Sequence, residues 1–251
     1  MENTKTADVI CDYADTDYNK NFWQGEVDRS YEDLSEKDIV SKLLPKTGGS
    51  VIDLGAGFGR LAIVYKDRFT DVTLLDYANN LLDQARELYK DSKNIQYVQG
   101  SCYEIPVADS SVENAVSFRL MHHLNDVPKF FGETARILKP GGKFILEYAN
   151  KRNALEILRF IFGRSDRGPF DLMPYQYGTK IFYNFHPRFI SKLAEAKGFR
   201  IKAVYSLSNF RSNILKKIFE AKTLFLFEKL LRRPLGYLYW GPSIVLEMEK
   251  K

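Results

Sequence analysis

Cysteine and histidine are scarce in this sequence of 251 residues. It contains two cysteines, Cys11 and Cys102, and three histidines. Two cysteines are too few for a disulfide framework or for a zinc knuckle of paired cysteines. The histidines have no matching Cys, Asp or Glu spacing, so we expect no metal site. So few cysteines fit a reducing compartment, and we therefore expect a cytoplasmic protein.

Long apolar runs are also absent. No stretch approaches the ~20 apolar residues that a transmembrane helix needs, and the acidic, polar N-terminus is not typical of a signal peptide. With 45% hydrophobic and 27% charged residues, the composition is ordinary for a globular protein. The length predicts one sizeable α/β domain with an appendage, or at most two small domains.

The net charge of +5 is unevenly distributed. Residues 1–150 hold 17 Lys and Arg against 24 Asp and Glu, a balance of −7, whereas residues 151–251 hold 20 against 8, a balance of +12. The basic half indicates an anionic substrate, a membrane surface or nucleic acid as a partner. Scattered, solvated lysines are an equally good interpretation.

A glycine-rich turn follows the first predicted strand. Residues 50–54 form a short apolar run, Gly55, Gly57 and Gly59 follow at alternate positions, and residues 60–68 are compatible with a helix. Glycines let the main chain turn sharply and let a ligand approach it. The turn lies at the carboxyl end of a strand, where open α/β sheets bind ligands.

Two acidic residues accompany this turn. Asp53 lies in the end of the first strand, and Asp76 ends a second predicted strand, residues 72–76, 17 positions after Gly59. That spacing is close to the ~20 residues at which a carboxylate takes ribose hydroxyls. Asp53 would oppose a pyrophosphate but suits an ammonium and a sulfonium. Because Arg60 replaces the third glycine of a dinucleotide motif, a nicotinamide cofactor is disfavoured.

Further motifs follow in order. A third strand at 95–98 leads into residues 99–103, and a fourth at 112–118 leads into Arg119-Leu120-Met121-His122-His123-Leu124. A helix at 127–138 precedes Leu138-Lys139-Pro140-Gly141-Gly142-Lys143 and a fifth strand at 144–148. In this order the motifs resemble class I S-adenosylmethionine (SAM)-dependent methyltransferases of the small-molecule, methyltransferase domain 11-like type.

The resemblance implies an α/β fold. We expect a Rossmann-like seven-stranded sheet in the order 3-2-1-4-5-7-6, with strand 7 antiparallel, helices on both faces and a helical, aromatic cap. The expected parts are an N-terminal lid and first helix (1–49), the SAM-binding core (50–150), a cap insertion (151–185), core completion (186–208), a second helical cap insertion (209–240) and the last strand (241–251). Most apolar residues of both insertions are expected to pack on the core.

SAM, with S-adenosylhomocysteine as product, is the cofactor that the resemblance implies. The methionine end would lie at Asp53, Gly55, Ala56, Gly57, Gly59 and Arg119. The ribose would lie at Asp76, and the adenine at Tyr77, Leu81, Ser101, Cys102 and Tyr103. Ser101-Cys102 departs from the Asp and small residue that the family usually has there.

Methyl transfer needs a general base only when the nucleophile must lose a proton. His122 and His123 are the candidate catalytic residues, although adjacent histidines point in different directions and a structural role is more common. Residues that could face the substrate come from the lid and from the cap, and Trp23 could instead anchor the lid to the core. They are Tyr18, Trp23, Arg29, Tyr31, Tyr175, Tyr177 and His186.

Three functions remain open. The first is methylation of a small or lipid-like acceptor, which can be anionic. The second is methylation of RNA or protein, which the basic half favours, although nucleic acid is the weaker candidate. The third is SAM binding without catalysis. Peripheral membrane contact is compatible with the sequence, and the oligomeric state is not predicted.

Overall fold

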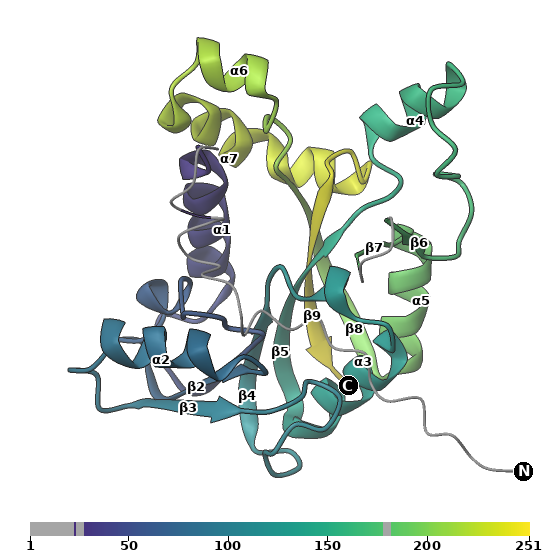
Figure 1. Ribbon diagram of the computed structural model, residues 1–251. Helices are drawn as coiled ribbons and strands as arrows, with labels where there is room; N and C mark the ends of the chain where they lie inside the picture. Colours follow the sequence, from purple (N-terminus) through teal and green to yellow (C-terminus); the bar gives the residue numbers. More distant parts are fainter. Residues whose placement is uncertain (1–22, 24–27, 178–181) are drawn as a thin grey trace, which may run out of the picture.

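A seven-stranded sheet forms the centre of the computed structural model, which describes Trp23, residues 28–177 and residues 182–251 (Figure 1). The sheet order is β3-β2-β1-β4-β5-β9-β8. The strands are β1 (Gly48–Leu54), β2 (Phe69–Asp76), β3 (Ile95–Gln99), β4 (Val112–Ser117), β5 (Leu138–Ala149), β8 (Phe199–Leu207) and β9 (Ser243–Lys250). β1 to β5 are parallel, and β9 is antiparallel to β5 and β8. Since β8 and β9 are the sixth and seventh strands of this sheet along the chain, the predicted order and direction are confirmed.

Helices cover both faces of the sheet (Figure 1). The apolar side chains of α1 (Ser30–Leu43) and α2 (Asn79–Leu88) join one buried cluster, and those of α3 (Val127–Ile137) and α5 (Pro187–Ala196) join the other. β5 contributes to both, with Ile145 on one side and Phe144 on the other, because side chains alternate along a strand.

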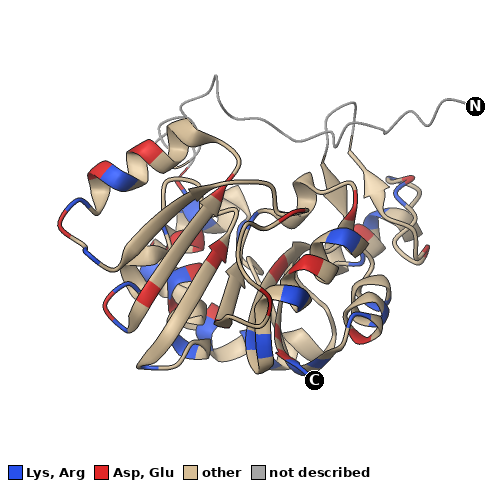
Figure 2. Ribbon diagram, turned by 90° about the horizontal axis from the view of Figure 1, so that it is seen from below, with Lys and Arg blue, Asp and Glu red and all other residues tan. Residues whose placement is uncertain are grey.

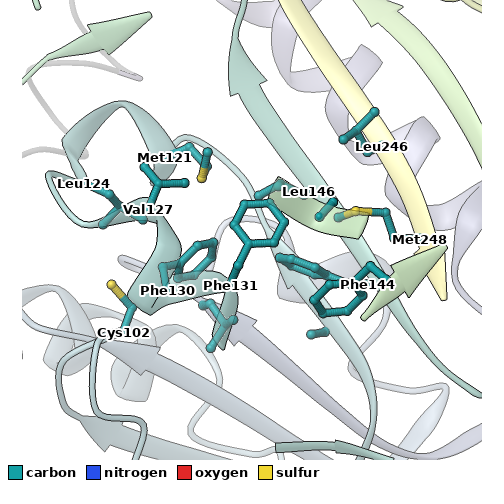
Figure 3. Packing of buried hydrophobic residues seen from close by; sticks show 14 of the residues in the cluster. Cys102, Met121, Leu124, Val127, Phe130, Phe131, Phe144, Leu146, Leu246 and Met248 are labelled. Carbon is teal, nitrogen blue, oxygen red and sulfur yellow. The ribbon is translucent and has the colours of Figure 1, made fainter. Parts of the chain in front are cut away.

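Four phenylalanines form the centre of the second cluster (Figure 3). Phe130 and Phe131 from α3 meet Phe144 from β5 with ring centroids 6.1 Å apart, and Phe199 from β8 lies 5.5 Å from Phe144. These separations suit edge-to-face and tilted aromatic contacts. This packing holds α3 against the sheet. It thereby helps to position the loop that joins the carboxyl end of β4 to α3.

The helix predicted for residues 60–68 is wrong. Only a short 3₁₀ helix, η2 (Ala62–Val64), forms there, with turns on both sides. β2 already begins at Phe69, which leaves little length for a helix, and Ile63, Val64 and Tyr65 are poor helix formers. The helix predicted for residues 127–138 is present as α3, which ends one residue earlier.

Two segments project from the same end of the sheet (Figure 1). The first carries α4 (Ala154–Ile161) and the short hairpin of β6 (Tyr175–Gln176) and β7 (Tyr183–Asn184). The second carries α6 (Asn213–Ile218) and α7 (Ala221–Tyr237). Their apolar residues were expected to pack mostly on the core, and this is wrong: most of those on α4, α6 and α7 are exposed or half-buried, and Leu224 is a buried exception. Within the described ranges, no helix is both long and apolar enough to cross a bilayer.

Candidate active site

A pocket lies at the carboxyl ends of β1, β2, β3 and β4. It encloses about 1030 Å³ of empty space, its open mouth included. Its lining includes all the predicted cofactor residues except Gly59: Asp53, Gly55, Ala56, Gly57, Asp76, Tyr77, Leu81, Ser101, Cys102, Tyr103 and Arg119. Parallel strands bring the ends of distant sequence segments to one edge of the sheet, which explains why these residues meet.

The glycine turn is held against the end of β2. The amides of Gly55 and Ala56 donate to the carbonyl of Leu75 at 2.9 and 3.0 Å, and the amide of Gly57 donates to Asp76 Oδ2 at 2.7 Å. Gly55 has φ +75°, and a Cβ there would lie 2.9 Å from Leu120 Cδ1. The turn therefore needs glycine for its backbone conformation and for the close approach of a pocket side chain.

Gly59 lies on the side of the turn that packs against Tyr89 rather than on the pocket side. Its φ is +74°, and a Cβ would meet Tyr89 at 3.0 Å. The Tyr89 hydroxyl donates to the Gly59 carbonyl at 2.8 Å. This glycine lets α2 and the turn pack closely, and it is not among the residues that line the pocket.

Asp53 is a buried carboxylate in the pocket wall. Tyr65 donates its hydroxyl to Asp53 Oδ2 at 2.5 Å. Burial raises the pKa of Asp53 to about 6, even though the Tyr65 hydrogen bond and the charge of Arg60 lower it. A cation beside this carboxylate would favour its ionised form.

Asp76 anchors two neighbouring segments. Its Oδ2 accepts from Gly57 in the turn, and its Oδ1 accepts from the amide of Ala78 at 2.9 Å, just before α2. The same side chain lines the pocket. A ribose that approached Asp76 would therefore meet a carboxylate whose position is already determined by the backbone.

A group of charges and one indole form the side of the pocket next to α1. Glu36 on α1 accepts from Arg119 Nε at 2.9 Å and from Arg119 Nη2 at 2.5 Å, and it also binds Arg60. Arg60 donates to Asp33 at 2.6 Å. Burial raises the pKa of Glu36, but the charges of Arg119 and Arg60 outweigh it, and the pKa lies below its ordinary value.

Trp23 lies against both guanidinium groups. Its ring centroid is 3.8 Å from the Arg60 guanidinium carbon and 4.9 Å from that of Arg119, distances that suit cation–π contacts. Trp23 is also part of the pocket lining. Its substrate-facing role stays a prediction.

Arg119 has an unusual backbone. Its φ is +56°, in the left-handed region that a non-glycine residue rarely adopts. Its amide donates to Glu147 Oε2 at 2.9 Å, and Glu147 also accepts from the Ser243 hydroxyl. Burial raises the pKa of Glu147 against the charge of Arg119. Such local strain is stored at functional sites when surrounding contacts hold it.

The two histidines after β4 differ in position. They form η3 (Met121–His123), and His123 lines the pocket, whereas His122 is not part of the lining. The His122 ring lies 4.6 Å from the Phe182 ring. Burial, together with the charges of His123 and Arg119, holds the pKa of His122 well below its ordinary value, so this side chain is neutral near pH 7.

The segment at the predicted adenine end folds into a tight turn. The Tyr103 amide donates to the Ser101 hydroxyl at 3.1 Å. The Tyr103 hydroxyl donates to Asn125 Oδ1 at 2.7 Å and accepts from the Asn125 amide at 2.9 Å. Ser101 and Cys102 thus line the pocket as parts of an ordered turn, although the usual acidic residue is missing.

The other predicted substrate residues lie away from the pocket lining, and Tyr18 lies outside the described residues. Tyr31 is buried between α1 and α7, where its hydroxyl donates to Glu228 at 2.6 Å. Arg29 precedes α1, and His186 caps α5, where its Nδ1 accepts from the Arg188 amide at 3.1 Å.

Tyr175 and Tyr177 belong to the hairpin segment. Their ring centroids are 6.5 Å apart, and the Tyr177 ring lies 4.6 Å from the Arg167 guanidinium carbon. In the described part of the chain, no three His, Cys, Asp or Glu side chains are grouped so that they could hold a metal ion.

Sequence reasoning missed several lining residues. Phe118, Leu120 and Leu124 make apolar wall beside His123, and Arg60 joins Trp23 at the other side. The apolar residues belong to residues 118–124, the segment that contains both histidines. The position of this segment at the end of a predicted strand could have indicated that they line the pocket. No local pattern indicated that Glu36 would face Arg119, because only the packing of α1 on the sheet brings them together.

Comparison with known proteins shows which proteins this chain is similar to. A methyltransferase domain model matches residues 52–146. Over 147 residues the chain is 29% identical to a malonyl-[acyl-carrier protein] O-methyltransferase of Xylella fastidiosa, with 56% of this chain and 48% of the relative covered. A probable S-adenosylmethionine-dependent methyltransferase of Mycolicibacterium smegmatis is 28% identical over 132 residues, covering 53% and 47%. The chain spans about half the length of these curated relatives.

Solved structures share the fold. A SAM-dependent methyltransferase from Mesorhizobium loti superposes with a TM-score of 0.63 at 18% identity, covering 88% of this chain and all of that one. The sheet order, the glycine turn with its two acids and the domain match agree with one another. Residues 52–146 thus match a methyltransferase domain, and the chain as a whole has the fold of class I SAM-dependent methyltransferases.

Proposed function

We propose that the chain transfers the methyl group of SAM to a small or lipid-like, anionic acceptor. The observation that carries the proposal is the pocket, where the glycine turn, Asp53 and Asp76 lie next to a second wall made by the loop after β4. The glycine turn and the two acids suit a cationic amino acid and a ribose. The wall made by the loop after β4 offers apolar and aromatic surface around the place where an acceptor would meet the methyl group.

SAM supplies a methyl group on a sulfonium, so the protein has mainly to bind, align and exclude water. In the proposed arrangement Asp53 favours the positive end of SAM, and Asp76 holds the ribose. Phe118, Leu120 and Leu124 keep water from the reacting atoms. A carboxylate oxygen is already deprotonated at neutral pH, and its methylation needs no general base.

An anionic acceptor agrees with three observations. The relative from Xylella fastidiosa is named an O-methyltransferase of a malonyl group on a carrier protein. The second half of the chain is basic. His122, which is neutral and outside the lining, is poorly placed as a base, which leaves His123 for any acceptor that must lose a proton.

The test is transfer of label from methyl-labelled SAM. Purified protein would be incubated with a lipid extract, with small carboxylic acids, with tRNA and with unrelated protein. We expect label in the lipid or small-acid samples. Asp76→Ala should weaken SAM binding about tenfold to a hundredfold, as expected for lost charge-assisted hydrogen bonds, and should lower transfer by a similar factor when SAM is limiting.

Asp83→Ala is the matched control. Asp83 is an exposed acid on α2 that pairs with Arg86 at 2.5 Å, so its loss should leave transfer unchanged. SAM binding without transfer to any sample would support the non-catalytic function instead. Label in tRNA or in protein would overturn the proposed acceptor class while keeping the methyltransferase.

RNA or protein methylation is favoured only by the basic charge of the second half. Figure 2 shows basic and acidic segments mixed along the ribbon rather than divided into two blocks. RNA binding would depend steeply on salt, because phosphate contacts release counterions. A shallow salt dependence of tRNA binding would remove this alternative.

A further inference from the structure

Helix α7 turns its charged side inward and its apolar side outward. Leu224, Glu228, Arg232 and Gly236 recur every four residues and are buried. On the other side Leu226 is 64% exposed, Leu230 74% and Tyr237 66%. A surface helix normally has the opposite arrangement, with its apolar stripe on the core.

Polar contacts with α1 hold this orientation. Glu228 accepts from Tyr31 at 2.6 Å, and Asn209 Nδ2 donates to Glu228 at 2.9 Å. Arg232 forms an ion pair with Asp38 at 2.6 Å. A rotation of α7 that buried its leucines would pull these groups apart and leave charges unpaired, which is strongly destabilising. The outward apolar face is therefore built into the fold.

Two further helices, α6 and α4, also carry exposed apolar residues. On α6, Ile214 and Ile218 are exposed one turn apart, and Phe219 follows. On α4, Leu155, Leu158 and Ile161 are exposed at three-residue spacing. Both segments project from the same end of the sheet (Figure 1), the end that holds the pocket. Apolar groups clustered in this way mark an interaction site.

The charges beside these apolar residues are basic. Residues 211–240 contain seven Lys and Arg and two acids, Glu220 and Glu228; with the buried Arg232 and Glu228 set aside, six basic residues remain against one acid. Lys217 and Lys222 are exposed, whereas Lys229 pairs with Asp38 at 3.3 Å and Arg233 is half-buried. Basic residues beside leucine and aromatic side chains are typical of helices that lie in the interface of an anionic bilayer.

We propose that α4, α6 and α7 form a docking surface for an anionic lipid bilayer. The apolar side chains enter the boundary between headgroups and acyl chains, and the lysines contact lipid phosphates. Tyr237 and Trp240 are amphipathic aromatic residues of the kind found at that depth. The proposal goes beyond methyl transfer, since docking requires neither SAM nor turnover.

A second copy of the chain fits this surface less well. In a symmetric dimer the same patch would face itself, and the lysines of α6 and α7 would lie opposite one another. Like charges in such a contact oppose association. An anionic bilayer supplies both the apolar layer and the opposite charge.

The test is co-sedimentation of the full chain with vesicles. We expect binding to phosphatidylcholine vesicles that contain phosphatidylglycerol, little binding to pure phosphatidylcholine, and weakening by salt. Leu226→Gln with Leu230→Gln should weaken binding about tenfold or more, because two side chains no longer enter the apolar layer. Lys217→Glu with Lys222→Glu should remove the preference for anionic lipid.

Ile63→Gln with Leu88→Gln is the matched control. These residues are 52% and 57% exposed and belong to η2 and α2. We expect unchanged vesicle binding, with circular dichroism and SAM titration confirming that every variant is folded. Equal binding to both kinds of vesicle, or none, would overturn the proposal. Light scattering that shows a dimer lost in the double leucine variant, without vesicle binding, would assign the surface to a second copy.

Discussion

The protonation of Asp53, which lies in the pocket wall, should affect cofactor affinity. Its pKa of about 6 lies above the ordinary 3.8 because the side chain is buried. Between these values the folded state holds a proton that the unfolded state releases, so the contribution of Asp53 to stability falls as pH rises through this range. The unfavourable free energy at Asp53 is thus the cost of burying a charge. At Arg119 it is the cost of a left-handed backbone conformation.

SAM affinity should therefore rise with pH through about 6. The ammonium and sulfonium of SAM favour ionised Asp53, and well below its pKa the affinity should fall about tenfold per pH unit. Calorimetric titration on both sides of pH 6 measures this. Asp53→Asn should bind more weakly with a flat profile, and an unchanged slope in that variant would show that another group titrates.

The glycine turn and the α1–α7 pair are held in place in different ways. The turn is a local structure that is latched to β2 by backbone amides. The helix pair joins residues near the two ends of the chain through Tyr31 and Glu228. We therefore expect the turn to be destabilised by added side-chain volume, and the helix pair to be destabilised by the loss of a polar partner.

Gly55→Ala should destabilise the protein more than Gly141→Ala. Both glycines have similar positive φ, +75° and +76°, which costs an alanine about 1–2 kcal/mol. The new Cβ would meet Leu120 at Gly55 but nothing within 4 Å at Gly141. Chemical denaturation and SAM titration compare the two variants. We expect SAM affinity to fall for Gly55→Ala only. Equal losses of stability and affinity in the two variants would show that the contact with Leu120 does not matter.

Tyr31→Phe should lower the free energy of unfolding by about 1–3 kcal/mol, because the buried Glu228 loses a donor. Burial already raises the pKa of Glu228. Tyr31 was predicted to face the substrate, but its place between α1 and α7 leads us to expect unchanged methyl transfer. A loss of turnover at full stability would restore the substrate role.

At the scale of the whole molecule, cofactor binding and stability are linked. A ligand that binds only the folded state stabilises it by mass action, by about 2.7 kcal/mol at a hundredfold excess over its Kd. For a chain of this size, that should raise the melting temperature by about 5–10 °C. Scanning calorimetry with SAM, S-adenosylhomocysteine and NADH tests this. The first two should stabilise and NADH should not, because Asp53 opposes a pyrophosphate and Arg60 replaces the third glycine of a dinucleotide motif.

The amino-acid sequence by itself determined the strand ends and most of the pocket, and the sheet order followed from the resemblance of its motifs to SAM-dependent methyltransferases. Strand ends, glycine spacing and the two acids are local signals, and the parallel arrangement brings such ends to one edge. Nearly all predicted cofactor residues consequently line one cavity. The helix predicted after the turn failed because the early start of β2 outweighed the local pattern.

Only the tertiary structure decided which long-range partners meet. Glu36 faces Arg60 and Arg119 because α1 packs over the turn, and Trp23 lies against both arginines. α7 has a helical pattern that sequence reasoning assigned to the core, yet its apolar side faces outward. Periodicity shows that a helix has two faces, but the buried bonds to Tyr31 and Asp38 determine which face is inside.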